Sequence, residues 1–404
     1  MDIRIQPSRA VGSVTAPPSK SMAHRLLIVA GLSNGCSVIE GVEFSQDIYA
    51  TVDCLRALGV RVEVDEQQGR VAVFGRFPFL PTDDAVLPCR ESGSTMRFFI
   101  PLALLLDKHI AFTGAERLLE RPMTIYEDIC SRQGLQYSRG NSGIEVCGPL
   151  RPGLFTMPGD VSSQFLTGLL LALPLLPGDS DIVLTTPLES RPYVDLTLAA
   201  LKNGGITVEE VSPVHFRVPG NQSYTAVNGR VEGDYSNAAF LEALNMLGGD
   251  VAVDGLREDS LQGDRIYRTY FRQLANGSPA LDIHDCPDLA PILMTLAAEL
   301  HGCTLQGTRR LRIKESDRST VMERELRKFG ADITVNDDTI VIRKSKLHKP
   351  KVQLSGHNDH RIVMSLAVLA TKYGGEIVGA HAVTKSYPSF WEIMQQLGIQ
   401  IERL

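Results

Sequence analysis

The chain has 404 residues, which is too long for one small core and indicates at least two domains. With 43% hydrophobic residues, 22% charged residues and a net charge of -6, it is neither a disordered chain nor a general nucleic-acid-binding surface. Its longest nearly uncharged apolar stretches, 98–106 and 165–176, are shorter than the roughly 20 residues that span a bilayer, so we expect no membrane partner. The N-terminus resembles neither a signal nor a transit peptide, and seven scattered cysteines are typical of reduced thiols, so we expect a cytoplasmic protein.

Taken in chain order, the predicted elements repeat. Six apolar segments have the pattern of buried helices, and they begin at Ser19, Ser92, Ser162, Ser236, Pro287 and Asn358. An amphipathic helix follows each of them and closes with a glycine at which we expect a left-handed C-cap; these glycines are Gly59, Gly134, Gly204, Gly277, Gly330 and Gly398. Runs rich in Val, Ile and Thr, such as 60–75 and 331–344, then predict strands.

These six units predict an α/β fold in two groups of three, with the apolar helices inside each group and the sheets outside. The polar, glycine-containing stretch 219–234 marks the crossing between the groups. The first strand, 2–8, precedes the first buried helix, so it is able to pair with the second group. We therefore expect a discontinuous domain, residues 1–14 plus 230–404, and an inserted domain, residues 15–229.

Cations recur at the starts of the buried helices and just before the amphipathic ones. Positive charge beside a helix N-terminus opposes the helix macrodipole, which favours anions there. Bound phosphate or carboxylate groups would explain this recurrence at equivalent repeat positions. Solvated surface charge is the alternative interpretation of any single one. The set comprises Lys20, Arg25, Arg97, Arg121, Lys314, Arg318, Arg361 and Lys385.

Three further patterns allow a structural as well as a functional interpretation. The polar triplet 162–164 opens an apolar helix, where N-capping would account for one serine. Within 314–318, two cations bracket an acid inside about one helical turn, as ordinary ion pairs at a helix start would. His357 and His360 raise the question of a metal, but no third ligand at suitable spacing accompanies them, so we expect none.

Ten motifs run in order from about Lys20 to Phe390: PSKSMAHR, SGSTMR, ERPM, GDVSSQFLTGLLLALPLL, ESRPYVDLTL, EGDYSNAAFLEAL, CPDLAPIL, RIKESDRS, NDHRIVMSLAVLA and TKSYPSF. Together and in register, they resemble the 5-enolpyruvylshikimate-3-phosphate (EPSP) synthase family. The resemblance implies a two-domain inside-out α/β barrel of six βαβαββ-type repeats, with the active site in the cleft between domains that close on substrate. It implies no metal or organic cofactor.

The activity implied by the resemblance is transfer of the enolpyruvyl group of phosphoenolpyruvate to the 5-hydroxyl of shikimate 3-phosphate. Phosphate is released through a tetrahedral intermediate, in the shikimate pathway to chorismate and the aromatic amino acids. Both substrates are polyanions, which agrees with the recurring cations, and water exclusion would protect the intermediate. The addition and elimination steps require a base and an acid.

Carried over position by position, the resemblance also assigns residues. Those expected to hold shikimate 3-phosphate are Lys20, Ser21, Arg25, Ser162, Ser163, Gln164, Ser190, Tyr193, Asp288 and Lys314. Those expected to hold phosphoenolpyruvate are Lys20, Gly93, Arg121, Gln164, Arg318, Arg361 and Lys385. Asp288 and Glu315 are the expected proton-transfer carboxylates, with Lys20 as a further catalytic residue. Glu91 and Arg310 stand where the family often has Asn, so the contacts of those two positions are in question.

Two other functions are alternatives to this one. Transfer of enolpyruvate to a UDP-amino sugar would use the same type of fold, but that sister family carries a reactive loop cysteine and lacks SSQFLT. A non-catalytic anion-binding or RNA-terminus-binding protein is opposed by the complete set of cations and carboxylates and by the negative net charge. We expect a monomer that acts on two small-molecule substrates and binds no nucleic acid.

Overall fold

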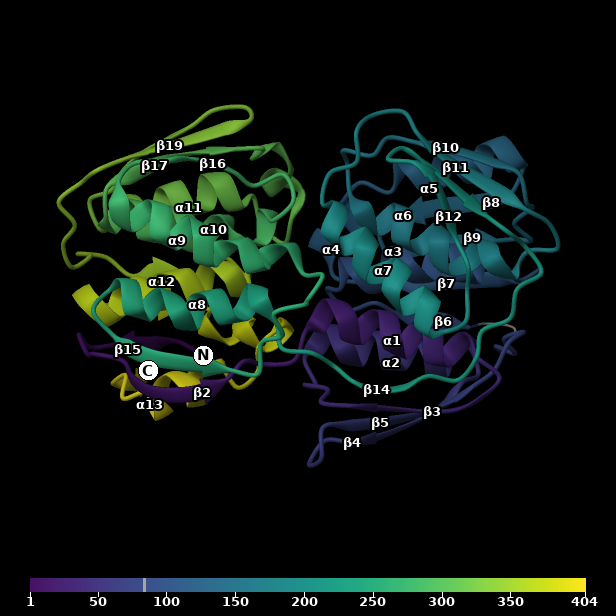
Figure 1. Cartoon of the computed structure of the whole chain (residues 1–404), viewed down its shortest axis with the longest axis horizontal. Coiled ribbons are helices and arrows are strands. Elements are labelled where there is room, and N and C mark those ends of the chain that lie inside the picture. The colour runs from purple at the N-terminus through teal and green to yellow at the C-terminus, as the bar shows by residue number, and fades with distance from the viewer. Residues whose placement is uncertain (83–84) are drawn as a thin grey trace. The chain divides into compact units, whose positions relative to one another are not determined.

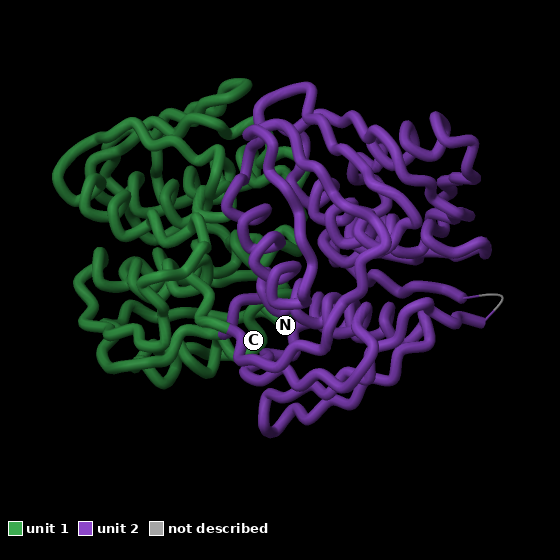
Figure 2. The backbone as a smooth tube through the Cα atoms, turned by 45° about the vertical axis from the view of Figure 1, so that its right-hand side comes forward, with its two compact units in different colours: residues 1–17, 232–404 green, residues 18–231 purple. Residues whose placement is uncertain are grey.

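A computed structural model describes residues 1–82 and 85–404 of the chain (Figure 1). The chain divides into two compact units, residues 1–17 with 232–404 (unit 1) and residues 18–231 (unit 2), coloured green and purple in Figure 2. Each unit has its own hydrophobic core. Within the described ranges, no helix is both long and apolar enough to cross a membrane.

The described residues of unit 2 form three four-stranded sheets with one shared strand pattern. Two neighbouring strands run parallel, and an antiparallel hairpin continues the sheet. The sheets are β14 (Asn228–Arg230), β3 (Gly35–Glu40), β5 (Arg70–Gly75), β4 (Arg61–Asp65); β6 (Val86–Pro88), β7 (His109–Thr113), β9 (Gly143–Cys147), β8 (Gln136–Gly140); and β10 (Leu154–Met157), β11 (Ser180–Leu184), β13 (His215–Val218), β12 (Glu209–Ser212).

Unit 1 repeats this pattern with strands borrowed from the N-terminal segment. Its sheets are β16 (Ala280–Asp282), β17 (Gly302–Gln306), β19 (Thr339–Arg343), β18 (Asp332–Val335); β20 (Leu354–Ser355), β21 (Gly375–Val378), β1 (Ile3–Ile5), β22 (Ile401–Arg403); and the pair β15 (Asp250–Asp254), β2 (Val11–Thr15). Strand β1 pairs with β21 and β22, and β2 pairs with β15. The expectation that the first strand pairs with the second half of the chain is confirmed.

The helices alternate in character along the chain. The apolar ones are α1 (Lys20–Leu32), α3 (Gly93–Ala103), α6 (Ser163–Ala172), α8 (Tyr235–Met246), α10 (Ala290–Glu299) and α12 (His360–Tyr373). The others are α2 (Gln46–Ala57), α4 (Glu116–Glu120), α5 (Thr124–Gln133), α7 (Arg191–Asn203), α9 (Tyr267–Asn276), α11 (Arg318–Arg327) and α13 (Phe390–Gln396). Short 3₁₀ segments are η1 (Leu173–Leu175), η2 (Gly263–Ile266), η3 (Pro287–Leu289), η4 (Arg309–Ile313) and η5 (Ala380–Lys385).

Burial explains why each unit has helices inside and sheets outside (Figure 1). The helices α1, α3, α6, α8, α10 and α12 are buried along most of their length, because apolar residues cover nearly their whole circumference. Strands such as β19 instead alternate buried and more exposed positions, so one face meets the core and the other meets solvent. The predicted inside-out arrangement is confirmed.

The predicted glycine caps are right at four of six positions. Gly59, Gly134, Gly330 and Gly398 have positive φ values between 67° and 97° after their helices. Gly204 has φ -79°, because the next residue, Gly205, takes the left-handed conformation at φ 78°. Gly277 has φ 165° and is extended. Sequence reasoning cannot distinguish which of two adjacent glycines turns the chain, nor a helix that runs directly into an extended segment.

Candidate active site

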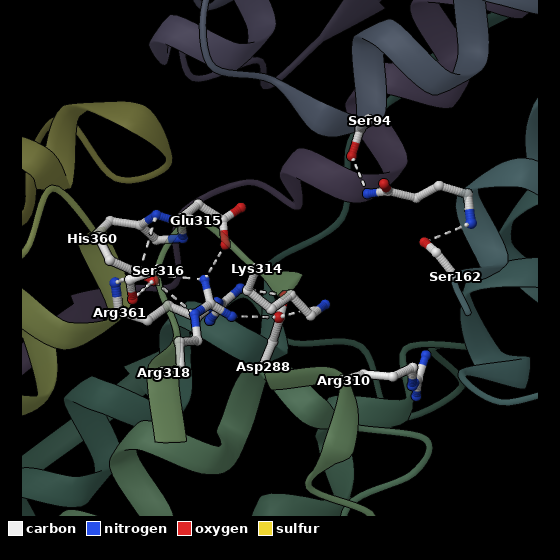
Figure 3. Close-up of polar contacts among 12 residues, drawn as sticks. Ser94, Ser162, Asp288, Arg310, Lys314, Glu315, Ser316, Arg318, His360 and Arg361 are labelled. Carbon is white, nitrogen blue, oxygen red and sulfur yellow. Dashed lines mark hydrogen bonds and ion pairs between the residues drawn. The ribbon is translucent and has the colours of Figure 1, made fainter. Parts of the chain in front are cut away.

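In unit 1, acidic and basic side chains gather around Arg318, the first residue of α11 (Figure 3). Its side chain is 1% exposed and donates to three carboxylates. Nε reaches Asp359 Oδ2 at 2.8 Å, Nη1 reaches Asp288 Oδ1 at 2.9 Å, and Nη2 reaches Glu315 Oε2 at 2.6 Å. Burial alone would lower the pKa of Arg318, but Asp359, Glu315 and Asp288 raise it. The guanidinium is therefore a fixed positive centre.

Asp288, in η3 at the entrance to α10, accepts from several cations at once. Besides Arg318, Arg361 Nη2 reaches Oδ2 at 2.9 Å and Lys314 Nζ lies 3.5 Å from Oδ1. Burial would raise the pKa of Asp288, but attraction to Arg361, Lys314 and Arg318 holds it well below its ordinary value. The carboxylate is therefore an acceptor, and it becomes a stronger base only if these cations are drawn to another anion.

Lys314 has an unusual proton affinity for a lysine. Its burial, reinforced by repulsion from Arg318 and Arg310 and opposed by Asp288 and Glu315, lowers the pKa to about 8. Arg310, buried in η4, donates Nη2 to the carbonyl oxygen of His284. Arg310 stands where the family resemblance leads one to expect Asn, and its positive charge helps to lower the pKa of Lys314.

The expectation that residues 314–318 form one helical turn is wrong. Lys314 is extended, with φ -84° and ψ -162°, and α11 begins only at Arg318. Asp317 is the N-cap, and its side chain accepts from the backbone N–H of Thr320 at 3.3 Å, which starts the helix at this point. Glu315 is left in the preceding bend, from which it reaches Arg318.

Lys385 and Arg361 are placed by the segment between β20 and α12. Lys385, the last residue of η5, is buried and donates Nζ to the carbonyl oxygen of Asn358 at 2.5 Å. Asp359 is the N-cap of α12 and accepts from the backbone N–H of Arg361 at 3.0 Å. Unit 1 thus brings together all of its predicted site residues, whereas Asp359 was missed, because an aspartate at a helix start reads as an ordinary N-cap.

In unit 2, two of the predicted cations, Lys20 and Arg25, lie in the first half of α1. Lys20 follows the N-cap Ser19 and donates Nζ to Asp47 Oδ2 at 2.6 Å. Arg25 is buried and donates to Thr197 Oγ1 at 2.9 Å, and to the carbonyl oxygens of Ser21 at 2.6 Å and Tyr193 at 2.8 Å. Burial lowers the pKa of Arg25 to about 10, so the side chain remains a cation at neutral pH.

A second polar group joins the starts of α3 and α6 (Figure 3). Ser162 is the N-cap of α6, as predicted, and its Oγ accepts from the backbone N–H of Gln164 at 3.3 Å. The Gln164 side chain donates Nε2 to Ser94 Oγ at 2.8 Å and accepts from Arg97 Nη1 at 2.6 Å. Ser163 is the buried first residue of α6. Farther along the chain, Ser190 precedes α7 with a left-handed φ of 57°.

Gly93 and Arg121 lie against each other. Gly93 is the first residue of α3, and a Cβ added there would lie only 2.5 Å from Arg121 Nη1. The buried Arg121 follows α4 and precedes α5, as the predicted pattern of cations before amphipathic helices requires. Glu91, where the family resemblance leads one to expect Asn, lies just before Ser92, the N-cap of α3.

A buried hydrogen-bonded chain below these helix ends was not predicted. His24 Nδ1 lies 2.7 Å from Thr51 Oγ1, Thr51 Oγ1 lies 2.9 Å from Thr95 Oγ1, and Thr95 donates to Ser92 Oγ at 2.8 Å. Because the Thr95 proton goes to Ser92, Thr51 donates to Thr95 and His24 Nδ1–H donates to Thr51. Burial, followed by Lys20 and Arg25, keeps the pKa of His24 well below its ordinary value. These hydrogen bonds between uncharged side chains link α1, α2 and α3 to one another.

Comparison with known proteins gives consistent matches over the whole chain. A family model described as EPSP synthase (3-phosphoshikimate 1-carboxyvinyltransferase) matches residues 5–394. The 3-phosphoshikimate 1-carboxyvinyltransferase of Clostridium novyi is 40% identical over 425 residues, covering 98% of this chain and 97% of that protein. Its counterpart in Clostridium kluyveri is 41% identical over 421 residues, covering 99% and 98%.

Two solved structures share the fold. An EPSP synthase from Acinetobacter baumannii superposes with a TM-score of 0.78 at 23% identity, covering 100% of both chains. The enolpyruvyl transferase NikO from Streptomyces tendae superposes with a TM-score of 0.79 at 15% identity, covering 99% of this chain and 98% of that one. At these identities the two structures establish the α/β architecture.

Proposed function

The chain belongs to the EPSP synthase (3-phosphoshikimate 1-carboxyvinyltransferase) family, and we propose that the charged clusters of both units are the parts of this enzyme that hold its two substrates. The enzyme transfers the enolpyruvyl group of phosphoenolpyruvate to the 5-hydroxyl of shikimate 3-phosphate and releases phosphate. This reaction belongs to the shikimate pathway of aromatic amino acid biosynthesis. The observation that carries the site assignment is the burial of cations, with Arg318 and Arg361 at helix starts and Arg25 in the second turn of α1, where polyanionic substrates would complete their charge balance.

In the proposed site, unit 2 holds the phosphate of shikimate 3-phosphate. Arg25 supplies a buried cation, and the start of α6 supplies the Ser162 and Ser163 hydroxyls with the positive end of a helix dipole. Ser21, Gln164, Ser190 and Tyr193 belong to the same set. From unit 1, Asp288 accepts from a ring hydroxyl and Lys314 donates to one.

Phosphoenolpyruvate, which carries a phosphate and a carboxylate, is assigned to the remaining cations. In unit 1 these are Arg318, Arg361 and Lys385, and in unit 2 they are Lys20 and Arg121, with Gln164 and the backbone at Gly93. Charge-assisted hydrogen bonds from several cations offset the mutual repulsion of the two anionic substrates. Lys20, which pairs with Asp47, also supplies a positive charge that stabilises negative charge developing on the transferred group.

We assign the two proton transfers to Asp288 and Glu315. When an anionic substrate draws Arg361 and Arg318 toward itself, the pKa of Asp288 rises and this carboxylate becomes a better base for the substrate hydroxyl. In the complex with both substrates Glu315 is protonated, and it delivers its proton to the methylene carbon while Asp288 takes the hydroxyl proton and the new C–O bond forms. In elimination Glu315 takes a proton back from the methyl carbon, the C–O bond to phosphate breaks, and Asp288 returns its proton to the departing phosphate. The ion pair between Glu315 and Arg318 orients the carboxyl group for both steps.

An acceptor exchange tests the proposed use of the site. Phosphate release from phosphoenolpyruvate is expected with shikimate 3-phosphate as acceptor and to be absent with UDP-N-acetylglucosamine. Release that is equally fast with the sugar nucleotide, or that needs no acceptor, would contradict the assignment.

We also propose that the protein is a cytoplasmic monomer. Its seven cysteines are all free thiols, which suits a reducing compartment. Light scattering at micromolar concentration measures its mass and so tests the monomeric state.

Gly93→Ala is expected to raise the Michaelis constant for phosphoenolpyruvate by roughly tenfold, because the added methyl group displaces the Arg121 guanidinium and weakens a charge-assisted contact. The Michaelis constant for shikimate 3-phosphate should stay within about twofold, a change too small to signify a lost hydrogen bond. Gly140→Ala is the matched control in the same unit, because its new methyl group would meet no atom within 4 Å. Equal changes in both Michaelis constants would reject the placement of phosphoenolpyruvate at Gly93.

The pKa of about 8 at Lys314 predicts a pH dependence of shikimate 3-phosphate binding. Below this pKa the side chain is a cation, and above it the charge is lost, so affinity should fall as pH rises through about 8. The full loss of a charge-assisted hydrogen bond corresponds to roughly 10- to 100-fold in affinity. Calorimetric titrations from neutral to alkaline pH measure the effect. Lys314→Met should bind shikimate 3-phosphate weakly, and its affinity should not fall as pH rises through about 8. The same fall in that variant would exclude Lys314 as its cause.

A further inference from the structure

The segment between β20 and α12 has an uncommon backbone. His357 and Asn358 both lie in the left-handed region, with φ 47° and 54°. Asn tolerates this region better than most residues do, whereas His357 needs support from its surroundings. The carbonyl oxygen of Asn358, in this segment, accepts a hydrogen bond from Lys385 Nζ. The segment also leads directly into the first turn of α12, which includes Arg361. Whatever holds this backbone therefore also places two proposed ligands of phosphoenolpyruvate.

Glu325, in the last turn of α11, is a buried carboxylate that the proposed chemistry does not use. Its side chain is 1% exposed, and it accepts from His357 Nε2 at 2.9 Å, from Lys328 Nζ at 2.7 Å and from the backbone N–H of Ser355 at 2.8 Å. Burial would raise the pKa of Glu325, but the hydrogen bonds from His357, Lys328 and Ser355 lower it. An ionised carboxylate thus anchors the segment on both sides of Gly356.

The ring of His357 is oriented by two neighbours on α11. Arg324 Nη2 lies 3.0 Å from both ring nitrogens, Nδ1 and Nε2. A carboxylate can only accept, so Nε2 carries the hydrogen that the ring donates to Glu325. In the orientation that makes both contacts, the backbone at His357 is left-handed, with φ 47°.

Helix α11 holds the segment at a second point. Arg318 lies seven residues, or about two turns, before Glu325, so the two side chains leave the helix on the same side. Arg318 binds Asp359 at 2.8 and 3.3 Å, while Glu325 binds Ser355 and His357. Asn358, whose carbonyl oxygen accepts a hydrogen bond from Lys385 Nζ, lies between these two points of attachment to α11.

We propose that Glu325 and His357 are positioning residues, a clamp that keeps the backbone at 357–358 left-handed so that Lys385 and Arg361 face phosphoenolpyruvate. This inference rests on the proposed function, because it takes the two cations to be ligands of that substrate. Neither clamp residue touches substrate. The clamp also gives His357, which the sequence raised only as a candidate metal ligand, a place in the enzyme.

The backbone conformation offers a sharp test. His357→Ala removes the contact with Glu325 and leaves a side chain that disfavours positive φ, whereas His357→Gly removes the same contact but tolerates positive φ without strain. We expect the Michaelis constant for phosphoenolpyruvate to rise about tenfold in His357→Ala and clearly less in His357→Gly. His357→Asn, whose side chain is compatible with this region, should also retain more affinity than the alanine variant. Binding of shikimate 3-phosphate, measured by calorimetry, should be unchanged in all three.

Glu325→Gln completes the test. If Glu325 acts by holding His357 left-handed, its substitution should raise the Michaelis constant for phosphoenolpyruvate in the wild-type background and do so much less in the His357→Gly background. Lys328→Met is the control, because it removes a different donor from Glu325, together with a hydrogen bond to the Gln353 carbonyl oxygen, and leaves the His357 side chain unchanged. A thermal unfolding midpoint is measured for each variant, and the comparison of glycine with alanine stands even if Glu325→Gln does not fold.

The outcomes separate the clamp from the function on which it rests. Lys385→Met is expected to raise the Michaelis constant for phosphoenolpyruvate, and failure to do so would overturn the assignment of this cation to the substrate. If Lys385→Met behaves as expected but His357→Ala and His357→Gly are equal, or both match wild type, the clamp is wrong and the substrate assignment stands. Parallel loss of stability in every variant without a selective change toward phosphoenolpyruvate would reduce the clamp to a purely structural contact.

Discussion

Replacing Glu315 with Gln is expected to lower turnover by about 10²- to 10⁴-fold, the usual cost of removing a general acid or base. The amide has the shape of the carboxylate, and its oxygen can still accept from Arg318 Nη2, which lies 2.6 Å from Oε2 in the wild type. It cannot deliver or receive the proton. Shikimate 3-phosphate should therefore bind normally by calorimetry while phosphate release collapses.

Glu323→Gln is the matched control for this prediction. Glu323 lies on the adjoining helix α11 and also pairs with an arginine, Arg327, at 2.8 Å, so its substitution removes a comparable ion pair outside the site. Turnover in this control should equal that of the wild type. If Glu315→Gln keeps more than about a tenth of wild-type turnover, the loss is too small for a general acid or base, and the role passes to Asp288 or to the lysines.

Arg318→Met is expected to cause the largest loss of stability. Arg318 is the shared partner of three carboxylates, one of which, Asp359, is 0% exposed. Removing one member of a buried charge pair typically costs about 3–5 kcal/mol, because the other charge stays buried without compensation. For a unit of this size that corresponds to a fall of roughly 6 to 20 °C in the thermal midpoint.

The pH dependence of this loss has a defined sign. The pKa of Asp288 is depressed in the folded protein, so the stability gained from its ionised form is present above the ordinary value of 3.8 and is lost as pH falls below it. Without Arg318 this depression weakens, so the difference in free energy of unfolding between variant and wild type should be constant above pH 3.8 and narrow only as pH falls below that value. Arg327→Met, in which the lost side chain is 57% exposed, should change stability by less than about 1 kcal/mol. A pH-independent difference would show that lost packing, and not charge, dominates.

The repeat architecture could be predicted because its signal is local and recurs six times. Helices such as α6 and α10 are apolar around their circumference, and only burial inside a unit satisfies such a surface. The cations before the amphipathic helices were predictable for a related reason. Residues at equivalent positions of successive repeats occupy similar places in the repeat structure. A residue type that recurs at such a position therefore indicates a shared environment.

The contacts that organise the site could not be predicted, because they join residues far apart in the chain. Asp47 pairs with Lys20 from another helix, and the hydrogen-bonded chain from His24 to Ser92 crosses three helices. In the sequence these residues look like ordinary helix polar residues. The start of α11 was misplaced for a different reason, since Asp317 competes as an N-cap with the apparent pattern of ion pairs beginning at Lys314.

The central proposal is that residues of both units bind the same substrate, and the affinity for shikimate 3-phosphate tests this proposal most directly. Arg25→Met alters unit 2 without leaving a buried acid unpaired, because Arg25 donates to a hydroxyl and two carbonyl oxygens. Lys314→Met alters unit 1. Calorimetric titration of each variant should show an affinity reduced by roughly 10- to 100-fold, the value of a charge-assisted hydrogen bond. Wild-type affinity in either variant, with its thermal midpoint preserved, would contradict the account.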